Sequence, residues 1–106
     1  MKNEQFNGIV ECRIEEIRSV LSKKAEEYAS AVDRLHNFKV AARKRNTTPE
    51  DALMGMAAKH DVSIDDLVLW AKDCPEKITY GLVNEKIGDM INYLILLEAL
   101  FVERLG

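Results

Sequence analysis

The segment from Val83 to Val102 constrains the fold more than any other part of the chain, because it is apolar on most sides of a helix. Its apolar residues recur at three- and four-residue steps along one stripe, and a second stripe lies beside the first. Such a helix lies at the centre of a fold or is shared with another subunit, so we expect a homo-oligomer, most simply a dimer. The first stripe is Val83, Ile87, Met90, Leu94, Leu97 and Phe101, and the second is Ile91, Ile95 and Val102.

The rest of the chain also reads as helix, with few interruptions. Only five Gly and two Pro occur in 106 residues, which favours a few long elements over many short strands. We predict helices over residues 4–29, 49–73 and 82–104, and a shorter helix that follows a bend at residues 30–38 and ends near Arg45. The expected fold is a single all-α domain over residues 1–106, a four-helix bundle with three long helices and one short one.

Local signals mark the boundaries of the two C-terminal helices. Thr48 can accept a backbone N–H as N-cap, and Pro49 suits the first helical position. Pro75 restricts the residue before it to extended conformations, and Gly81 permits a turn. We therefore expect the connection between these helices to run from Cys74 to Gly81.

Charge and composition exclude some classes of partner. The net charge of −3 creates no general attraction to a polyanion, so nucleic acid is not an expected partner. The longest apolar run, residues 90–102, is too short and too polar to span a bilayer, and we see no secretory signal. Cys12 and Cys74 lack zinc-ligand spacing and read as reduced thiols. We expect a cytoplasmic protein without a membrane partner.

Polar residues interrupt the last helix at helical spacing. Glu85, Asp89 and Asn92 stand at i, i+4 and i+7, which places them along one face. Carboxylates one turn apart can share Mg²⁺, which prefers oxygen ligands and binds phosphates at the same time. The alternative is that the two acids simply favour the positive end of the helix dipole, although a buried Asn92 would need partners.

A second polar stripe lies on the predicted helix 49–73. Lys59 and Ser63 are four residues apart, and His60 sits beside them within the apolar face. Across the bundle from Glu85 and Asp89, these side chains would supply phosphate-binding donors beside a metal, or else a buried salt-bridge network. A lone His on an apolar face is also often a hydrogen-bonded core residue.

A third candidate region is the predicted bend with the basic residues that follow it. In one interpretation the bend lines a pocket, with Asn37 reading a polar group, Phe38 stacking on a base and Lys39 beside them. In the other, the cations of residues 39–45 simply lie in solvent at a helix C-terminus, where they suit the dipole. No Gly-rich phosphate loop, Ser–His–Asp order or HExxH motif occurs, so the common motif-based enzyme classes are not indicated.

Three segments carry a resemblance to known proteins. The combination of "AEEYASAVDRLHNFKVAA", "AKHDVSIDDLV" and "EKIGDMINYLILLEAL" resembles a family of small phage and prophage proteins associated with nucleotide modification. The segment "EKIGDMINYLILL" also resembles the last helix of MazG-like, all-α nucleoside triphosphate pyrophosphatases. That resemblance implies a dimeric or tetrameric helical bundle whose acids hold Mg²⁺ and which releases pyrophosphate from nucleoside triphosphates.

The leading hypothesis of a nucleotide-binding protein also assigns metal ligands. Glu85 and Asp89 occupy the matching helix, and Glu27 could complete the metal shell from the first helix. The MazG-like signature has an acid three residues before the aspartate, where this sequence has Lys86. The acid stands one residue earlier, at Glu85.

These observations support three functional hypotheses. The first is a phage-type protein that binds a nucleotide or related phosphate compound, with Lys59 and His60 at the phosphate and Asn37 and Asn92 orienting the ligand. If it is an enzyme, Mg²⁺-dependent hydrolysis would give a nucleoside monophosphate and pyrophosphate. The second is a non-catalytic protein that sequesters a nucleotide messenger of host defence, which the Lys86 departure favours. The third is a structural or interaction protein whose last helix forms a dimer seam.

Overall fold

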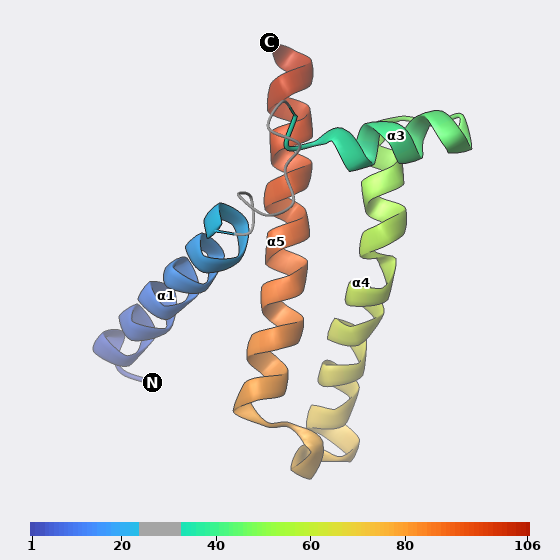
Figure 1. Ribbon diagram of the computed structural model, residues 1–106. Coiled ribbons are helices and arrows are strands. Elements are labelled where there is room, and N and C mark those ends of the chain that lie inside the picture. The colour runs from blue at the N-terminus through green and yellow to red at the C-terminus, as the bar shows by residue number, and fades with distance from the viewer. Residues whose placement is uncertain (24–32) are drawn as a thin grey trace. The chain divides into compact units, whose positions relative to one another are not determined.

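The computed structural model describes residues 1–23 and 33–106, and most of these residues are helical (Figure 1). The chain divides into two compact units, Met1–Arg34 and Leu35–Gly106, and each is described by itself. The predicted all-α class is confirmed, with three longer helices and one short one, while the prediction of a single domain stays a prediction. The described α-helices are α1 (Asn3–Ile17), α3 (His36–Arg45), α4 (Pro49–Asp73) and α5 (Tyr80–Leu105).

The first unit contains α1 and a following stretch of π-helix, η1 (Arg18–Lys23). A continuous α-helix over residues 4–29 was expected, so the change at Arg18 to wider helical turns differs from the prediction. Apolar side chains along α1 are largely exposed within this unit, as shown by Phe6 at 56% and Ile9 at 50%. Residues 24–32, which include the predicted metal ligand Glu27, lie outside the described residues.

The second unit begins with a turn and the short helix α3. The predicted end near Arg45 is confirmed. Of the predicted bend at residues 30–38, the described part has a turn at residues 34–35 before α3 begins at His36, and residues 30–32 lie outside the described residues. Leu35 and Phe38 are buried, whereas the cations of the last turn are exposed. Asn46 ends the helix with φ at 54°, a left-handed conformation that Asn tolerates better than most residues.

The N-terminus of α4 forms as its sequence predicts. Thr48 Oγ1 accepts a hydrogen bond from the Asp51 backbone N–H at 3.1 Å, and Pro49 occupies the first turn. Thr47 Oγ1 donates to the Asp51 carboxylate at 2.7 Å, which further fixes this turn.

The connection between α4 and α5 differs in one respect from the expectation. A short 3₁₀-helix, η2 (Pro75–Lys77), makes the turn, and Thr79 Oγ1 caps α5 by accepting from the Leu82 N–H at 3.2 Å. Gly81 therefore lies inside the first turn of α5, and the expectation that it supplies the turn was wrong. The hydroxyl cap at Thr79 begins the helix before the glycine is reached.

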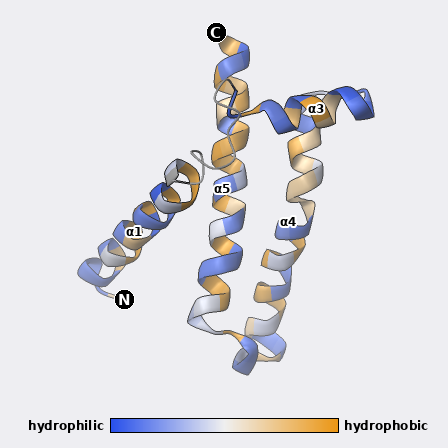
Figure 2. Cartoon of the chain, viewed as in Figure 1, coloured by the Kyte–Doolittle hydropathy of each residue, from blue (hydrophilic) through white to orange (hydrophobic). Residues whose placement is uncertain are grey.

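The helices α4 and α5 form an antiparallel hairpin, and α3 lies across one of its ends (Figure 1). Polar and apolar residues alternate along both helices, as amphipathic packing requires (Figure 2). The core lies where the three helices meet. Leu53 of α4 is completely buried there, among Leu35, Phe38 and Leu100.

Burial along α4 follows this location of the core. Ala52, Leu53 and Ala57, near α3, are buried, but Val68 is 68% exposed and Ala71 is also exposed. Apolar residues at helical spacing along residues 49–73 predict a buried stripe that includes Leu67, Val68 and Ala71. Leu67 is buried, at 7% exposed, but Val68 and Ala71 are not, so that part of the prediction was wrong. Among the described residues, no helix has the length and apolarity needed to cross a membrane.

Truncation of Leu53 tests the core directly. Leu53→Ala removes a side chain with no exposed surface, and we expect a loss of about 2–5 kcal/mol in the free energy of unfolding from lost burial and a residual cavity. Urea unfolding followed by circular dichroism measures this loss. The matched control is Val62→Ala, since Val62 on the same helix is 58% exposed. Equal losses in the two variants would contradict the assigned core.

An ion pair between α4 and α5 predicts a dependence of stability on pH. Arg104 donates to both carboxylate oxygens of Glu50 at 2.8 Å, and this holds the pKa of Glu50 at about 2, below its usual 4.5. The stabilisation is therefore present above pH 4.5 and is lost as the pH falls towards 2. We expect Glu50→Gln to lower the melting temperature at pH 7 by a few degrees and to flatten its fall below pH 4.5. Melting temperatures that fall in parallel below pH 4.5 in the wild type and in Glu50→Gln would contradict a stabilising Glu50–Arg104 ion pair.

Candidate ligand site

Near the middle of the α4–α5 hairpin, His60 lies between two residues of α5. Its Nδ1 is 3.6 Å from the Asp89 Oδ2, and its ring centroid is 5.0 Å from that of Tyr93. The His60 side chain is 16% exposed and the Asp89 side chain 45% exposed. The pair forms an ion pair when the imidazole is protonated, and the Tyr93 ring limits how the imidazole can rotate.

Asn92, near this position, has a buried side-chain oxygen that lacks a hydrogen-bond partner. Its side-chain Oδ1 is buried and has no hydrogen-bond partner among the described residues. A buried polar atom without a partner costs about 1–3 kcal/mol, so its presence calls for an explanation. Asn92 lies three residues after Asp89 on α5, which places the two side chains on neighbouring positions of one helix.

Three further predicted residues lie within about one helical turn of His60 or Asp89 along their own helices. Ser63 Oγ donates to the Lys59 backbone carbonyl at 3.0 Å, a local bond that leaves its oxygen able to accept. Lys59 is exposed on α4, and Glu85 is exposed on α5 one turn before Asp89. We refer to this set as the α4–α5 polar group, which comprises Lys59, His60, Ser63, Glu85, Asp89, Asn92 and Tyr93.

The carboxylates of this group suit Mg²⁺ only if a bound ligand supplies further oxygen atoms to the ion. Glu85 and Asp89 supply two carboxylates, whereas the described residues contain no group of three or more His, Cys, Asp or Glu side chains that could hold a metal ion. Mg²⁺ is commonly bound through one or two carboxylates together with water and substrate phosphates. The third predicted ligand, Glu27, lies outside the described residues.

The candidates on α3 lie elsewhere and take different roles. Phe38 is only 8% exposed and belongs to the hydrophobic core, so the expectation that it stacks on a base was wrong. Because α3 crosses the end of the hairpin, the Phe38 ring packs in the cluster that contains Leu53. Lys39 forms an ion pair with Glu103 of α5, and Asn37 is exposed.

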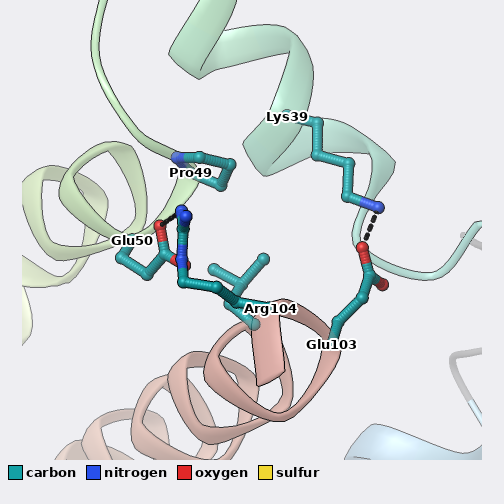
Figure 3. A pocket seen from close by; sticks show the side chains of 6 residues that line it. Lys39, Pro49, Glu50, Glu103 and Arg104 are labelled. Atoms are coloured by element: carbon teal, nitrogen blue, oxygen red, sulfur yellow. Dashed lines mark hydrogen bonds and ion pairs between the residues drawn. The ribbon is translucent and has the colours of Figure 1, made fainter. Parts of the chain in front are cut away.

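A pocket of about 270 Å³ lies at this end of the hairpin (Figure 3). Two ion pairs border it, Lys39 with Glu103 and Arg104 with Glu50, so each cation has an acid beside it. This balance leaves no net positive field for a phosphate. The lining residues are Lys39, Pro49, Glu50, Leu100, Glu103 and Arg104.

The predicted site residues therefore fall into two separate places. Asp89 and Glu103, which mark the two places on α5, are separated by about 21 Å along the helix axis. The structure brings His60 to Asp89 but leaves Lys39 at the far end of the hairpin. Tyr93 was not predicted, although its position four residues after Asp89 was a signal that could have identified it.

No protein-family model, curated protein or solved structure matches this chain in the three comparisons made. The resemblances to small phage proteins and to MazG-like pyrophosphatases thus stay predictions, and the function is argued from the α4–α5 polar group.

The unpartnered amide of Asn92 leads to a prediction about stability. Asn92→Leu replaces it with an apolar side chain of similar size, and without ligand we expect the free energy of unfolding to rise by about 1–3 kcal/mol. Urea unfolding measures the change. The control is Asn37→Leu, because Asn37 is exposed and its replacement should have little effect. A destabilised Asn92→Leu variant would mean that the amide already has a partner within the protein.

Proposed function

We propose that this protein binds a nucleotide or a related phosphate compound at the α4–α5 polar group, together with Mg²⁺. The observation that carries the proposal is the buried, unpartnered Oδ1 of Asn92, close in sequence to the His60–Asp89 pair. A ligand with hydrogen-bond donors would satisfy this atom, and stability lost in the free protein would be recovered on binding.

Each side chain of the group has a role that its position supports. Lys59 supplies positive charge, and His60 donates to phosphate while Asp89 orients its imidazole. The His60–Tyr93 ring pair offers an aromatic surface in place of the buried Phe38. Ser63 adds a hydroxyl with acceptor capacity beside Lys59.

Mg²⁺ enters the proposal through Glu85 and Asp89, one turn apart on α5. Two carboxylates hold the ion weakly by themselves, so its binding depends on phosphate oxygens from the ligand. When bound, the ion would neutralise phosphate charge and polarise a phosphoryl oxygen. Nucleotide and Mg²⁺ are therefore expected to bind cooperatively.

Binding without turnover is the form of this function that we favour. Lys86 stands where the MazG-like signature has an acid, and a cation at that place can pair with phosphate instead of holding metal. The resemblance to small phage proteins associated with nucleotide modification supports a nucleotide as the ligand. A protein that sequesters a nucleotide messenger would need this binding and no hydrolysis.

A thermal-shift panel of nucleoside triphosphates and cyclic nucleotides, with and without Mg²⁺, tests the proposal. We expect one ligand class to raise the melting temperature by several degrees, and more in the presence of Mg²⁺. Asp89→Asn should abolish the Mg²⁺-dependent part of the rise. The matched control is Asp65→Asn, which removes an exposed carboxylate from α4 outside the polar group.

Each outcome of the panel decides between the hypotheses. A rise without release of pyrophosphate supports the sequestering function, and release that Asp89→Asn abolishes supports the pyrophosphohydrolase. A rise that Asp89→Asn leaves unchanged would place the ligand elsewhere. No rise with any nucleotide would overturn the proposal and favour a structural or interaction protein.

A further inference from the structure

The first apolar stripe of α5 follows a seven-residue repeat, and its Leu97 borders the core around Leu100. From Val83 to Phe101 the spacing alternates between four and three residues, which is the pattern of a coiled-coil seam. This seam comprises Val83, Ile87, Met90, Leu94, Leu97 and Phe101.

The Glu50–Arg104 ion pair shows which side of α4 adjoins this seam. Steps of seven residues back along α5 from Arg104 reach Leu97, Met90 and Val83, so these residues share its side of the helix. On α4, Val68 lies five full turns beyond Glu50 and therefore faces the same way. The seam and Val68 thus belong to one face of the hairpin.

Part of this face is exposed within the unit Leu35–Gly106, whereas Ile87, Met90 and Leu97 are half-buried there. The exposed fractions are 68% for Val68, 47% for Leu94 and 48% for Phe101. Met54, about 100° from the buried Leu53 around α4, is 44% exposed. Such a concentration of apolar side chains on one face is typical of a protein–protein interface.

The size of the face matches what a dimer needs. Val83 to Phe101 spans about 27 Å, and two packed helices are about 20 Å wide, so the face covers roughly 500 Å² in projection. Two copies together would then bury roughly 1,000 Å², which is the lower end of the range for a specific complex.

We propose that a second copy of this chain packs on this face, with the two α5 helices antiparallel. The twofold axis then crosses the seam at the height of residue 92 along the helix. An antiparallel pair places Val83 against Phe101 of the other copy, Ile87 against Leu97, and Met90 against Leu94. The small Val83 then meets the large Phe101, and the other two layers pair residues of similar size. The three layers therefore have similar volumes. A parallel pair would instead oppose Phe101 to itself, and Arg104 to another arginine.

Sedimentation analysis of the full chain tests whether a second copy binds this face. The wild type is expected to be dimeric at tens of micromolar, and Leu94→Lys or Val83→Lys to weaken the dimer at least tenfold. Val62→Lys is the control, because Val62 lies about 180° from Leu53 on the opposite side of α4 and is 58% exposed. Circular dichroism checks that each variant is folded, which exposure of the replaced side chains favours. A monomeric wild type, or a dimer that both seam variants leave intact, overturns the proposal in favour of another occupant.

Disulfide crosslinking tests the orientation. In a chain with Cys12→Ser and Cys74→Ser, Val83→Cys and Phe101→Cys are prepared separately and then mixed under mild oxidation. An antiparallel dimer crosslinks in the mixture, since the thiol introduced at position 83 faces position 101 of the other copy, and crosslinks poorly in either protein alone. Crosslinking in each protein alone, with no crosslink between the two different variants in the mixture, would overturn the antiparallel arrangement.

Discussion

The burial of Leu53 among Leu35, Phe38 and Leu100 is the contact on which the second unit depends, because it joins α3, α4 and α5 at one point. It also sets the register of the hairpin. His60 lies seven residues after Leu53, and Tyr93 lies seven residues before Leu100, so in an antiparallel pair the two stay level. The ring contact and the nearby Asp89 therefore follow from the same register as the core.

The three sides of α5 carry different chemistry. One side packs on α4 around Leu100, and a neighbouring side presents Glu85 and Asn92, beside Asp89. A third side is the partly exposed seam that we assign to a second copy. This division explains why a helix with so much apolar surface also contains acids and an amide: each kind of residue serves a different neighbour.

The sequence predicted the boundaries of α4 well, because they depend on local chemistry. Thr48 and Pro49 begin α4, and Pro75 follows its end, as their capping and backbone preferences require. Gly81 misled the prediction because a hydroxyl cap at Thr79 had already begun α5. Local signals compete, and a cap that satisfies backbone N–H groups outweighs a residue that merely permits a turn.

The candidate site was predictable only in part, because it depends on tertiary packing. Periodicity placed Asp89 and Asn92 on one side of α5 and suggested that His60 faces the acids, and the structure brings His60 to Asp89. Periodicity could not show that α3 crosses the end of the hairpin, which buries Phe38. Aromatic residues are ambiguous in sequence for this reason, since Phe38 was read as a ligand contact and Tyr93 was not considered.

The central claim is that the ligand binds at the middle of the hairpin and not at its α3 end. A ¹H–¹⁵N correlation spectrum, recorded while a nucleoside triphosphate and Mg²⁺ are added, locates the binding site directly. We predict that the largest shifts fall on His60, Asp89, Asn92 and Tyr93, and that Asn37 and Lys39 change little. Shifts centred on α3, or an unchanged spectrum at millimolar nucleotide, would contradict the claim.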